Sequence, residues 1–244
     1  MNGRIIADKS MPQVRLGLPI IGKIKIGKKN DKGYPTSVDY FIADGRYAQQ
    51  FYKTFGEHPN TIQIMFTDDD PSKVCDQRYE YRNNKGELVS YGDGETFFFW
   101  NSQAKVWVES HNHDYMKSLA EHQPNKKINN GLFGWDIVLT IRFIIPMLRG
   151  IVGLWQLTTK GVESSIPNIV ETFDSMKEER GFVRGIIFDL NVSFAKSQKA
   201  DAASRFPVVT IVPNESQENI DKIRQALKPI NVLQMAKEDV EQIE

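Results

Sequence analysis

Three of the four histidines in the chain lie within one short segment, together with two acidic residues. His111 and His113 are separated by one residue, His122 follows, and Glu109 and Asp114 lie among them. A His-x-His pair on a strand directs both imidazoles to one face, and Zn²⁺ or a related metal accepts imidazole and carboxylate ligands together. The spacing matches no established metal motif, however, and the segment is polar enough to be a solvated loop. We favour the loop and keep a metal site, with a metal-dependent hydrolase activity, as the alternative.

The other groups that could react predict structure more readily than catalysis. Three aspartates at 68–70 precede Pro71, which is typical of a helix N-cap, although an acidic cluster can also bind Mg²⁺. The single cysteine, Cys75, excludes an intramolecular disulfide and a cysteine-based zinc cluster. The sequence contains no glycine-rich phosphate loop and no nucleophile elbow. We therefore expect a protein that is not an enzyme and needs no cofactor.

A group of lysines near the start of the chain is the best physical indication of a charged ligand. In the segment IIGKIKIGK (20–28), Lys23 and Lys25 alternate with isoleucines, and Lys28 and Lys29 continue toward a turn. Cations arranged in this way can neutralise DNA phosphates or contact an acidic partner, with a strong dependence on salt. The alternative is an edge strand that its lysines protect from aggregation.

A run of aromatic residues, FFFW at 97–100, provides a second possible contact surface. Aromatic side chains stack on the bases of single-stranded nucleic acid, so a single-stranded DNA-binding accessory protein is a further alternative. On a strand, however, alternate side chains face opposite sides of the sheet. We therefore expect at least half of this run to pack in the core.

Composition and charge exclude several classes of protein. The chain has 244 residues, of which 40% are hydrophobic and 25% charged, so it is not a disordered, collagen-like or disulfide-stapled protein. Residues 1–32 carry an excess of six positive charges and residues 215–244 an excess of three negative ones. The apolar stretch 135–155 contains two arginines, an aspartate and a proline, and a central charge costs about 2.5–3.5 kcal/mol on insertion into a membrane. We expect no membrane span, no export signal and a location in the cytoplasm.

The periodicity of apolar residues predicts an α+β protein with a mostly antiparallel sheet and several packed helices, forming one elaborated domain over 1–244. We expect a polar, loop-rich insertion around 102–134 and an acidic C-terminal tail around 228–244. Within 78–82, Arg78, Glu80 and Arg82 alternate with two tyrosines, as on a strand. The predicted strands are 20–28, 37–43, 61–67, 78–82, 88–91, 95–100, 104–108, 150–157, 183–194 and 206–212; the predicted helices are 45–55, 114–121, 168–179 and 215–227.

Several strings, taken in their order along the chain, resemble one family. They are YPTSVDYFIAD (34–44), FGEHPNTIQIMFTDDD (55–70), YGDGE (91–95), LRGIVGLWQLTTKG (148–161), GIIFDLNVSFAKSQ (185–198) and FPVVTIV (206–212). The chain resembles the recombination directionality factor-like proteins of phages and integrative elements that use large serine integrases. Members of that family usually carry a cysteine cluster after the GDGE-like turn, which this chain lacks.

The resemblance implies a binding protein rather than an enzyme. Such a factor engages a large serine integrase on its DNA sites in the bacterial host and shifts it from integration to excision. Direct contact with DNA is a further possibility. The integrase supplies the nucleophile, so the factor needs only a higher affinity for one synaptic arrangement than for the other. The resemblance transfers no catalytic residue to this chain.

Overall fold

The computed structural model describes residues 17–111, 135–196 and 205–227, and 47% of them lie in strands and 21% in helices. The strands are β1 (Ile20–Lys29), β2 (Pro35–Gly45), β3 (Thr61–Met65), β4 (Cys75–Arg82), β5 (Leu88–Gly92), β6 (Phe97–Asn101), β7 (Val106–Ser110), β8 (Asp136–Phe143), β9 (Leu154–Thr159), β10 (Ile187–Lys196) and β11 (Arg205–Pro213). The helices are α1 (Ala48–Phe55), α2 (Pro71–Val74), α4 (Ser165–Arg180) and α5 (Gln217–Leu227).

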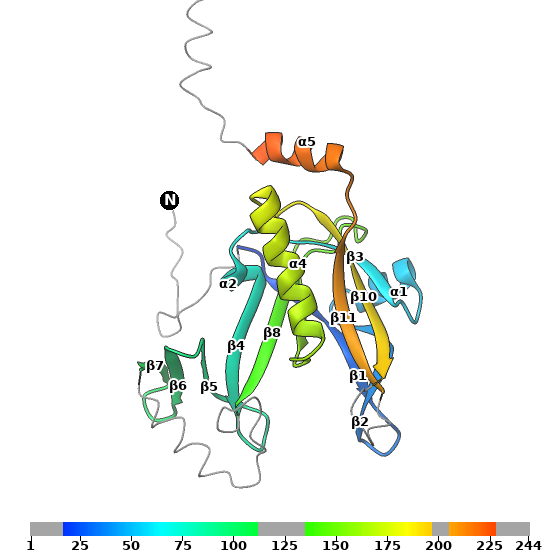
Figure 1. Cartoon of the computed structure of the whole chain (residues 1–244). Helices are drawn as coiled ribbons and strands as arrows, with labels where there is room; N and C mark the ends of the chain where they lie inside the picture. The colour runs from blue at the N-terminus through cyan, green and yellow to red at the C-terminus, as the bar shows by residue number, and fades with distance from the viewer. Residues whose placement is uncertain (1–16, 112–134, 197–204, 228–244) are drawn as a thin grey trace, which may run out of the picture.

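A large mixed sheet organises the molecule (Figure 1). Its eight strands have the order β2-β1-β9-β8-β4-β5-β6-β7, and a second sheet has the order β11-β10-β3. All neighbours in both sheets are antiparallel except β1 and β9, which run parallel. The β1–β2 hairpin therefore forms one end of the large sheet, and β6 and β7 form the other.

One hydrophobic cluster joins the two sheets and the longest helix. Helix α4 contributes Ile169 and Phe173, and the Phe173 ring meets that of Phe66 edge to face at 5.2 Å between centroids. Trp155 on β9 and Phe51 on α1 are fully buried in the same cluster. The burial of large aromatic side chains is the main source of stability in a core of this kind. This packing fixes β1 and α1 against the rest of the fold.

The approach of β1 to β9 depends on a residue without a side chain. A Cβ atom at Gly22 would lie 2.5 Å from the Trp155 ring, closer than two such atoms can approach. Gly22 thus lets the buried indole lie directly beneath the hairpin. This contact attaches the hairpin firmly to the core of the large sheet.

The fold class predicted from sequence was wrong. The protein is mostly β and is built on a large mixed sheet of eight strands, whereas the prediction was an α+β protein with several packed helices. Predicted helices 45–55, 168–179 and 215–227 correspond to α1, α4 and α5, whereas 114–121 lies outside the described residues. The parallel pairing of β1 with β9 joins segments about 130 residues apart in sequence, so no local periodicity could indicate it.

Some sequence predictions lie partly or wholly outside the described residues. The insertion predicted at 102–134 is described only up to His111 and includes β7 there. The rest of that segment and the predicted tail at 228–244 lie outside the described residues. Within the part that the structure describes, no helix is both long and apolar enough to cross a membrane.

Candidate functional site

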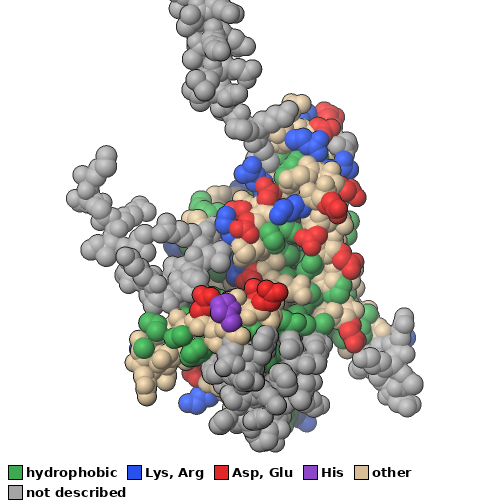
Figure 2. Space-filling model, turned by 60° about the vertical axis from the view of Figure 1, so that its left-hand side comes forward, with side chains coloured by type: hydrophobic (Ala, Val, Ile, Leu, Met, Phe, Trp, Pro, Cys, Tyr) green, Lys and Arg blue, Asp and Glu red, His purple; other side chains and the backbone are tan. Residues whose placement is uncertain are grey.

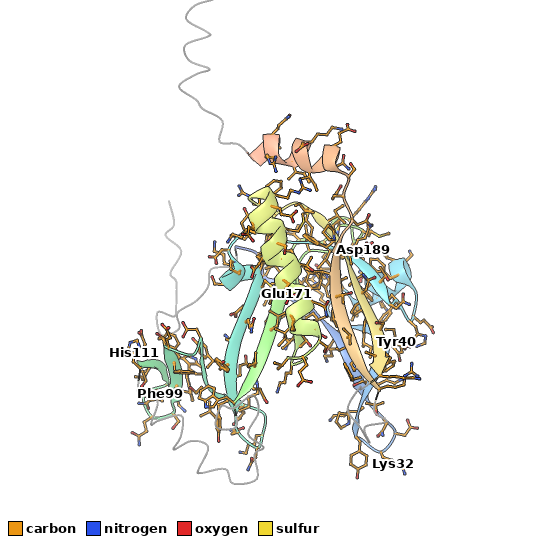
Figure 3. The ribbon with its side chains drawn as sticks, viewed as in Figure 1. Lys32, Tyr40, Phe99, His111, Glu171 and Asp189 are labelled. Carbon is orange, nitrogen blue, oxygen red and sulfur yellow. The ribbon has the colours of Figure 1, made fainter. Side chains whose placement is uncertain are left out.

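The basic hairpin is formed by β1, β2 and the turn between them, and carries Lys23, Lys25, Lys28, Lys29 and Lys32. Strand β1 pairs with β9 only over residues 20–24, and beyond that point its described partner is β2 alone. All residues from 27 to 37 are exposed. The hairpin therefore continues past the large sheet as a two-stranded ribbon, and Lys32 lies at its tip (Figure 3).

The five lysines of the basic hairpin have different partners. Lys25 forms an ion pair with Asp44 on β2, which lowers the pKa of the Asp44 carboxyl through a hydrogen bond from the ammonium group and through its charge. The Lys28 Nζ donates to Tyr40 Oη at 3.1 Å. Among the described residues, Lys29 and Lys32 have no carboxylate within ion-pair distance. Both side chains are exposed to solvent.

The sequence offered edge protection as the alternative explanation for these lysines. Strand β1 has a neighbour on both sides at Lys23, so that lysine does not lie on a sheet edge. Lys28 and Lys29 do lie in the two-stranded part of the hairpin, where β1 has one free edge among the described residues. Protection of an exposed edge can therefore explain these two lysines but not Lys23.

An aromatic hollow of about 440 Å³ opens at the base of the basic hairpin. It is lined by Tyr40, Ile42, Tyr52, Glu57 and His58. The rings of Tyr40 and His58 meet edge to face at 4.2 Å between centroids, and the backbone N–H of Ala43 donates to Tyr52 Oη at 3.1 Å. Sequence reasoning missed this hollow because its residues come from β2, α1 and the following turn, and no spacing along the chain indicates that they meet.

A polar face extends from the basic hairpin across the middle of the large sheet. The strand registers place Lys23 beside Gln156 and Gln156 beside Arg142, whose Nη2 lies 3.4 Å from Asp76 Oδ2. The opposite face of the same strands, with Ile24, Leu157, Ile141 and Cys75, packs in the hydrophobic cluster. Alternation along each strand separates the two faces.

An arginine clamp, formed by Arg78, Glu80 and Arg82, occupies β4 on this polar face. The Glu80 carboxylate is only 4% exposed and accepts hydrogen bonds from Nε and Nη2 of both arginines, at 2.7–3.0 Å. Arg78 donates to Oε1 and Arg82 to Oε2, so both oxygens of the buried carboxylate are satisfied, as a buried charge requires. The sequence showed this alternation of charges. A search for an acidic residue with a basic residue two positions before it and another two positions after it would have indicated the clamp.

An aromatic ladder continues the polar face beyond the arginine clamp. The Arg78 guanidinium lies 4.7 Å from the centre of the Tyr91 ring, which stacks on Phe98 at 5.1 Å. Both rings, with Arg78 and Asp93, line a second hollow of about 310 Å³. Phe97 faces the other side and, of the four residues in the aromatic run, is the one that is buried, so less of the run packs in the core than we expected.

Only the first of the three predicted metal-ligating histidines lies within the described residues. The His111 side chain is 71% exposed, its Nε2 is 3.3 Å from Glu109 Oε1, and it lies at the far end of the sheet from the basic hairpin (Figure 3). His113 and His122 are outside the described residues. The part of the chain that is described contains no group of three histidine, cysteine or acidic side chains arranged to hold a metal.

The aspartates at 68–70 have structural contacts. Asp70 accepts a hydrogen bond from the backbone N–H of Ser72 at 3.0 Å, which confirms the predicted N-cap of α2. Asp68 pairs with Lys73, and Asp69 accepts from the backbone N–H groups of Val183 and Arg184. Asp68 and Asp70 therefore hold α2 itself, and Asp69 connects its approach to residues 183–184.

Cys75 does not have the environment of a nucleophile. Its side chain lies in the hydrophobic cluster, and burial raises the pKa of the thiol to about 12. A reactive cysteine needs the opposite conditions, namely access to solvent and a lowered pKa. The lone cysteine is therefore a core residue, and it cannot take the place of the cysteine cluster expected from the resemblance.

Neither sign of charge forms one large patch on the face that Figure 2 shows. Figure 2 shows a face on which basic and acidic side chains are interspersed over the upper part of the view. The described residues therefore define a β-sheet protein with two preformed hollows, a basic hairpin and a polar face. Within the described residues, no nucleophile lies beside a base and an orienting group.

The comparison with family models identifies the family of this chain. A model described as Gp3-like, recombination directionality factor-like, matches residues 21–214. The chain belongs to this family, as the resemblance in the sequence predicted. The match includes the basic hairpin, both sheets and the polar face. It gives the protein a context of DNA recombination in phages and mobile elements, and the family, described as recombination directionality factor-like, is not a known enzyme family. No curated protein and no solved structure matches the chain.

Proposed function

We propose that this protein binds a large serine integrase on its DNA sites and shifts it from integration to excision. The observation that carries the proposal is the family match, which runs through residues 21–214 and so includes both sheets. The factor would act in the cytoplasm of a bacterial host and would need no cofactor. Its effect on the integrase would come from binding alone.

The energetic requirement is compatible with an ordinary protein interface. Moving an equilibrium between two synaptic arrangements from 1:99 to 99:1 takes about 5.5 kcal/mol of differential binding energy. A standard interface buries about 800 Å² on each partner, and a few central side chains supply most of its energy. The exposed hairpin and the aromatic hollow offer surface of the kind that such an interface uses.

A recombination assay with all four attachment sites tests the proposal. Purified cognate integrase is incubated with the original pair of sites or with the two hybrid sites, each with and without this protein. We expect the protein to promote recombination of the hybrid pair and to suppress that of the original pair. An integrase whose choice of sites is the same in both conditions would refute the proposal.

The same assay distinguishes the proposed function from the alternative in which the protein depends on a metal. We expect the effect of this protein to persist after it has been treated with EDTA and dialysed. A loss that Zn²⁺ restores, and that a His113→Ala variant reproduces, would instead indicate a metal site at His111, His113 and His122.

A further inference from the structure

We propose that the basic hairpin and the aromatic hollow form one docking surface for an acidic protein segment with a bulky apolar side chain. The apolar side chain enters the hollow, and acidic residues beside it contact Lys29 and Lys32. The inference rests on the proposed function, because that function makes the segment part of the integrase. It adds which surface of this chain makes the contact and which chemistry the contact requires.

The hollow is an open depression in the surface with aromatic walls. Its volume of about 440 Å³ accommodates one large side chain. Tyr40 and Tyr52 form aromatic walls, and their positions are fixed by contacts with His58 and with the backbone of Ala43. Pockets that are already formed lose little entropy when occupied, and bulky side chains in such pockets dominate the binding energy of protein interfaces.

Two lysines of the basic hairpin, Lys25 and Lys28, lie beside the hollow. Ile42, which lines the hollow, is the register neighbour of Lys25 across β1 and β2. The Lys28 ammonium contacts Tyr40 through both its hydroxyl, at 3.1 Å, and its ring, at 5.8 Å from the centroid. Tyr40 lies near the base of the hairpin and Lys32 at its tip (Figure 3). An extended segment that leaves the hollow past Lys28 would run toward the tip of the hairpin, where Lys29 and Lys32 are exposed.

The charges around the hollow favour a protein over DNA. Lys29 and Lys32 are cations without a carboxylate partner among the described residues, and the tip also exposes 66% of Tyr34. Three acidic residues lie close to these lysines: Asp44 pairs with Lys25, Glu57 lines the hollow, and Asp31 lies in the turn between Lys29 and Lys32. A phosphate backbone requires a continuous row of cations, which these carboxylates interrupt. Mixed charges around an apolar pocket are instead the usual anatomy of a protein interface.

Site-specific crosslinking tests the surface without disturbing the fold. A photoreactive phenylalanine analogue replaces Tyr34 in one variant and Trp100 in another, because both residues are exposed aromatics at opposite ends of the large sheet. The probe is the purified cognate integrase without DNA. We expect a crosslink to the integrase from position 34 and none from position 100. Crosslinking from position 100 alone would overturn the inference.

Three double variants test the two parts of the docking surface. They are Lys29→Glu with Lys32→Glu in the hairpin, Tyr40→Leu with His58→Ala in the hollow, and Lys85→Glu with Lys177→Glu as an exposed control with the same change in charge. We expect each of the first two to weaken integrase binding by about tenfold or more, and the control by less than about twofold. Thermal unfolding verifies that each variant is folded.

The outcomes separate this inference from the proposed function. If the wild-type protein and all three variants bind the integrase equally, the docking surface is wrong and the proposed function stands. If the wild-type protein does not bind the integrase, both fail. If the hairpin variant loses affinity only for an attachment-site duplex in the absence of integrase, the surface contacts DNA and the inference is overturned.

Discussion

The basic hairpin and the arginine clamp belong to the same sheet, yet they hold their positive charges in different ways. Arg78 and Arg82 each donate two hydrogen bonds to the buried carboxylate of Glu80. Lys29 and Lys32 are exposed, with no such carboxylate among the described residues. A positive charge is available to a ligand only where the fold has not already paired it, so a count of lysines and arginines does not locate a binding surface.

The largest effect is expected at the arginine clamp. A Glu80→Ala substitution leaves two guanidinium groups without their carboxylate, and we expect it to lower the free energy of unfolding by about 2–3 kcal/mol. This is below the cost of breaking a fully buried pair because Arg78 is 26% and Arg82 38% exposed. Chemical denaturation measures the change. Glu87→Ala, an exposed glutamate in the following turn, is the control, and an equal loss in both variants would contradict a special role for the clamp.

A smaller effect is expected where the basic hairpin joins the core. Gly22→Ala would force its Cβ against the Trp155 ring, and we expect a loss of about 1–2 kcal/mol in the free energy of unfolding from overpacking. Gly27→Ala, farther along the same strand, has its closest described contact at 3.3 Å, to Thr36 O. Its effect should be clearly smaller. Equal effects would show that the hairpin does not depend on the close approach of β1 to Trp155.

The turn beside the aromatic ladder gives a prediction about pH. Backbone N–H groups of Thr96 and Glu95 donate to the Asp93 carboxylate and lower its pKa from the ordinary value of 3.8. A lowered pKa in the folded state stabilises the protein above the unfolded-state pKa, and this stabilisation is lost as the pH falls through the folded-state pKa. The melting temperature of the wild type should therefore fall more steeply than that of Asp93→Asn between about pH 5 and pH 2. Asp39→Asn, at an exposed position, should behave as the wild type does.

The smallest effect on stability is expected at the tip of the basic hairpin. The Lys29→Glu, Lys32→Glu variant changes two exposed side chains, and we expect its free energy of unfolding to stay within about 0.5 kcal/mol of the wild type. Denaturation in parallel with the Glu80→Ala protein measures the contrast between the two regions. A large destabilisation would mean that these lysines have a structural role and would weaken the case for a docking surface.

The sequence predicted the local elements better than their assembly. Period-two alternation correctly indicated β1, β2 and most other strands, because their two faces have different environments. Strand β8 was not predicted as a strand. Its four consecutive residues 138–141 are all buried, so its sequence shows no alternation of apolar and polar residues. The segment was considered only as a possible membrane span. The fold class was wrong because the number of strands in the large sheet and its parallel pair depend on contacts between distant segments.

The candidate site was predictable only in part, for a related reason. Most lysines of the basic hairpin are consecutive or alternate along one strand, so the sequence predicted that they lie close together. Tyr40 and His58 are 18 residues apart and meet only because β2, α1 and the following turn fold together. The family resemblance, in contrast, depends on short strings in a fixed order and needs no knowledge of their contacts.

The measurement that tests the central claim most directly is a titration of this protein into a recombination reaction of its cognate integrase on the two hybrid sites. The wild-type protein, the Lys29→Glu, Lys32→Glu variant and the Lys85→Glu, Lys177→Glu control are compared at each concentration. We predict that the wild type and the control activate the reaction at the same concentration, and that the hairpin variant needs about tenfold more. Failure of the wild-type protein to activate the reaction at any concentration would contradict the account.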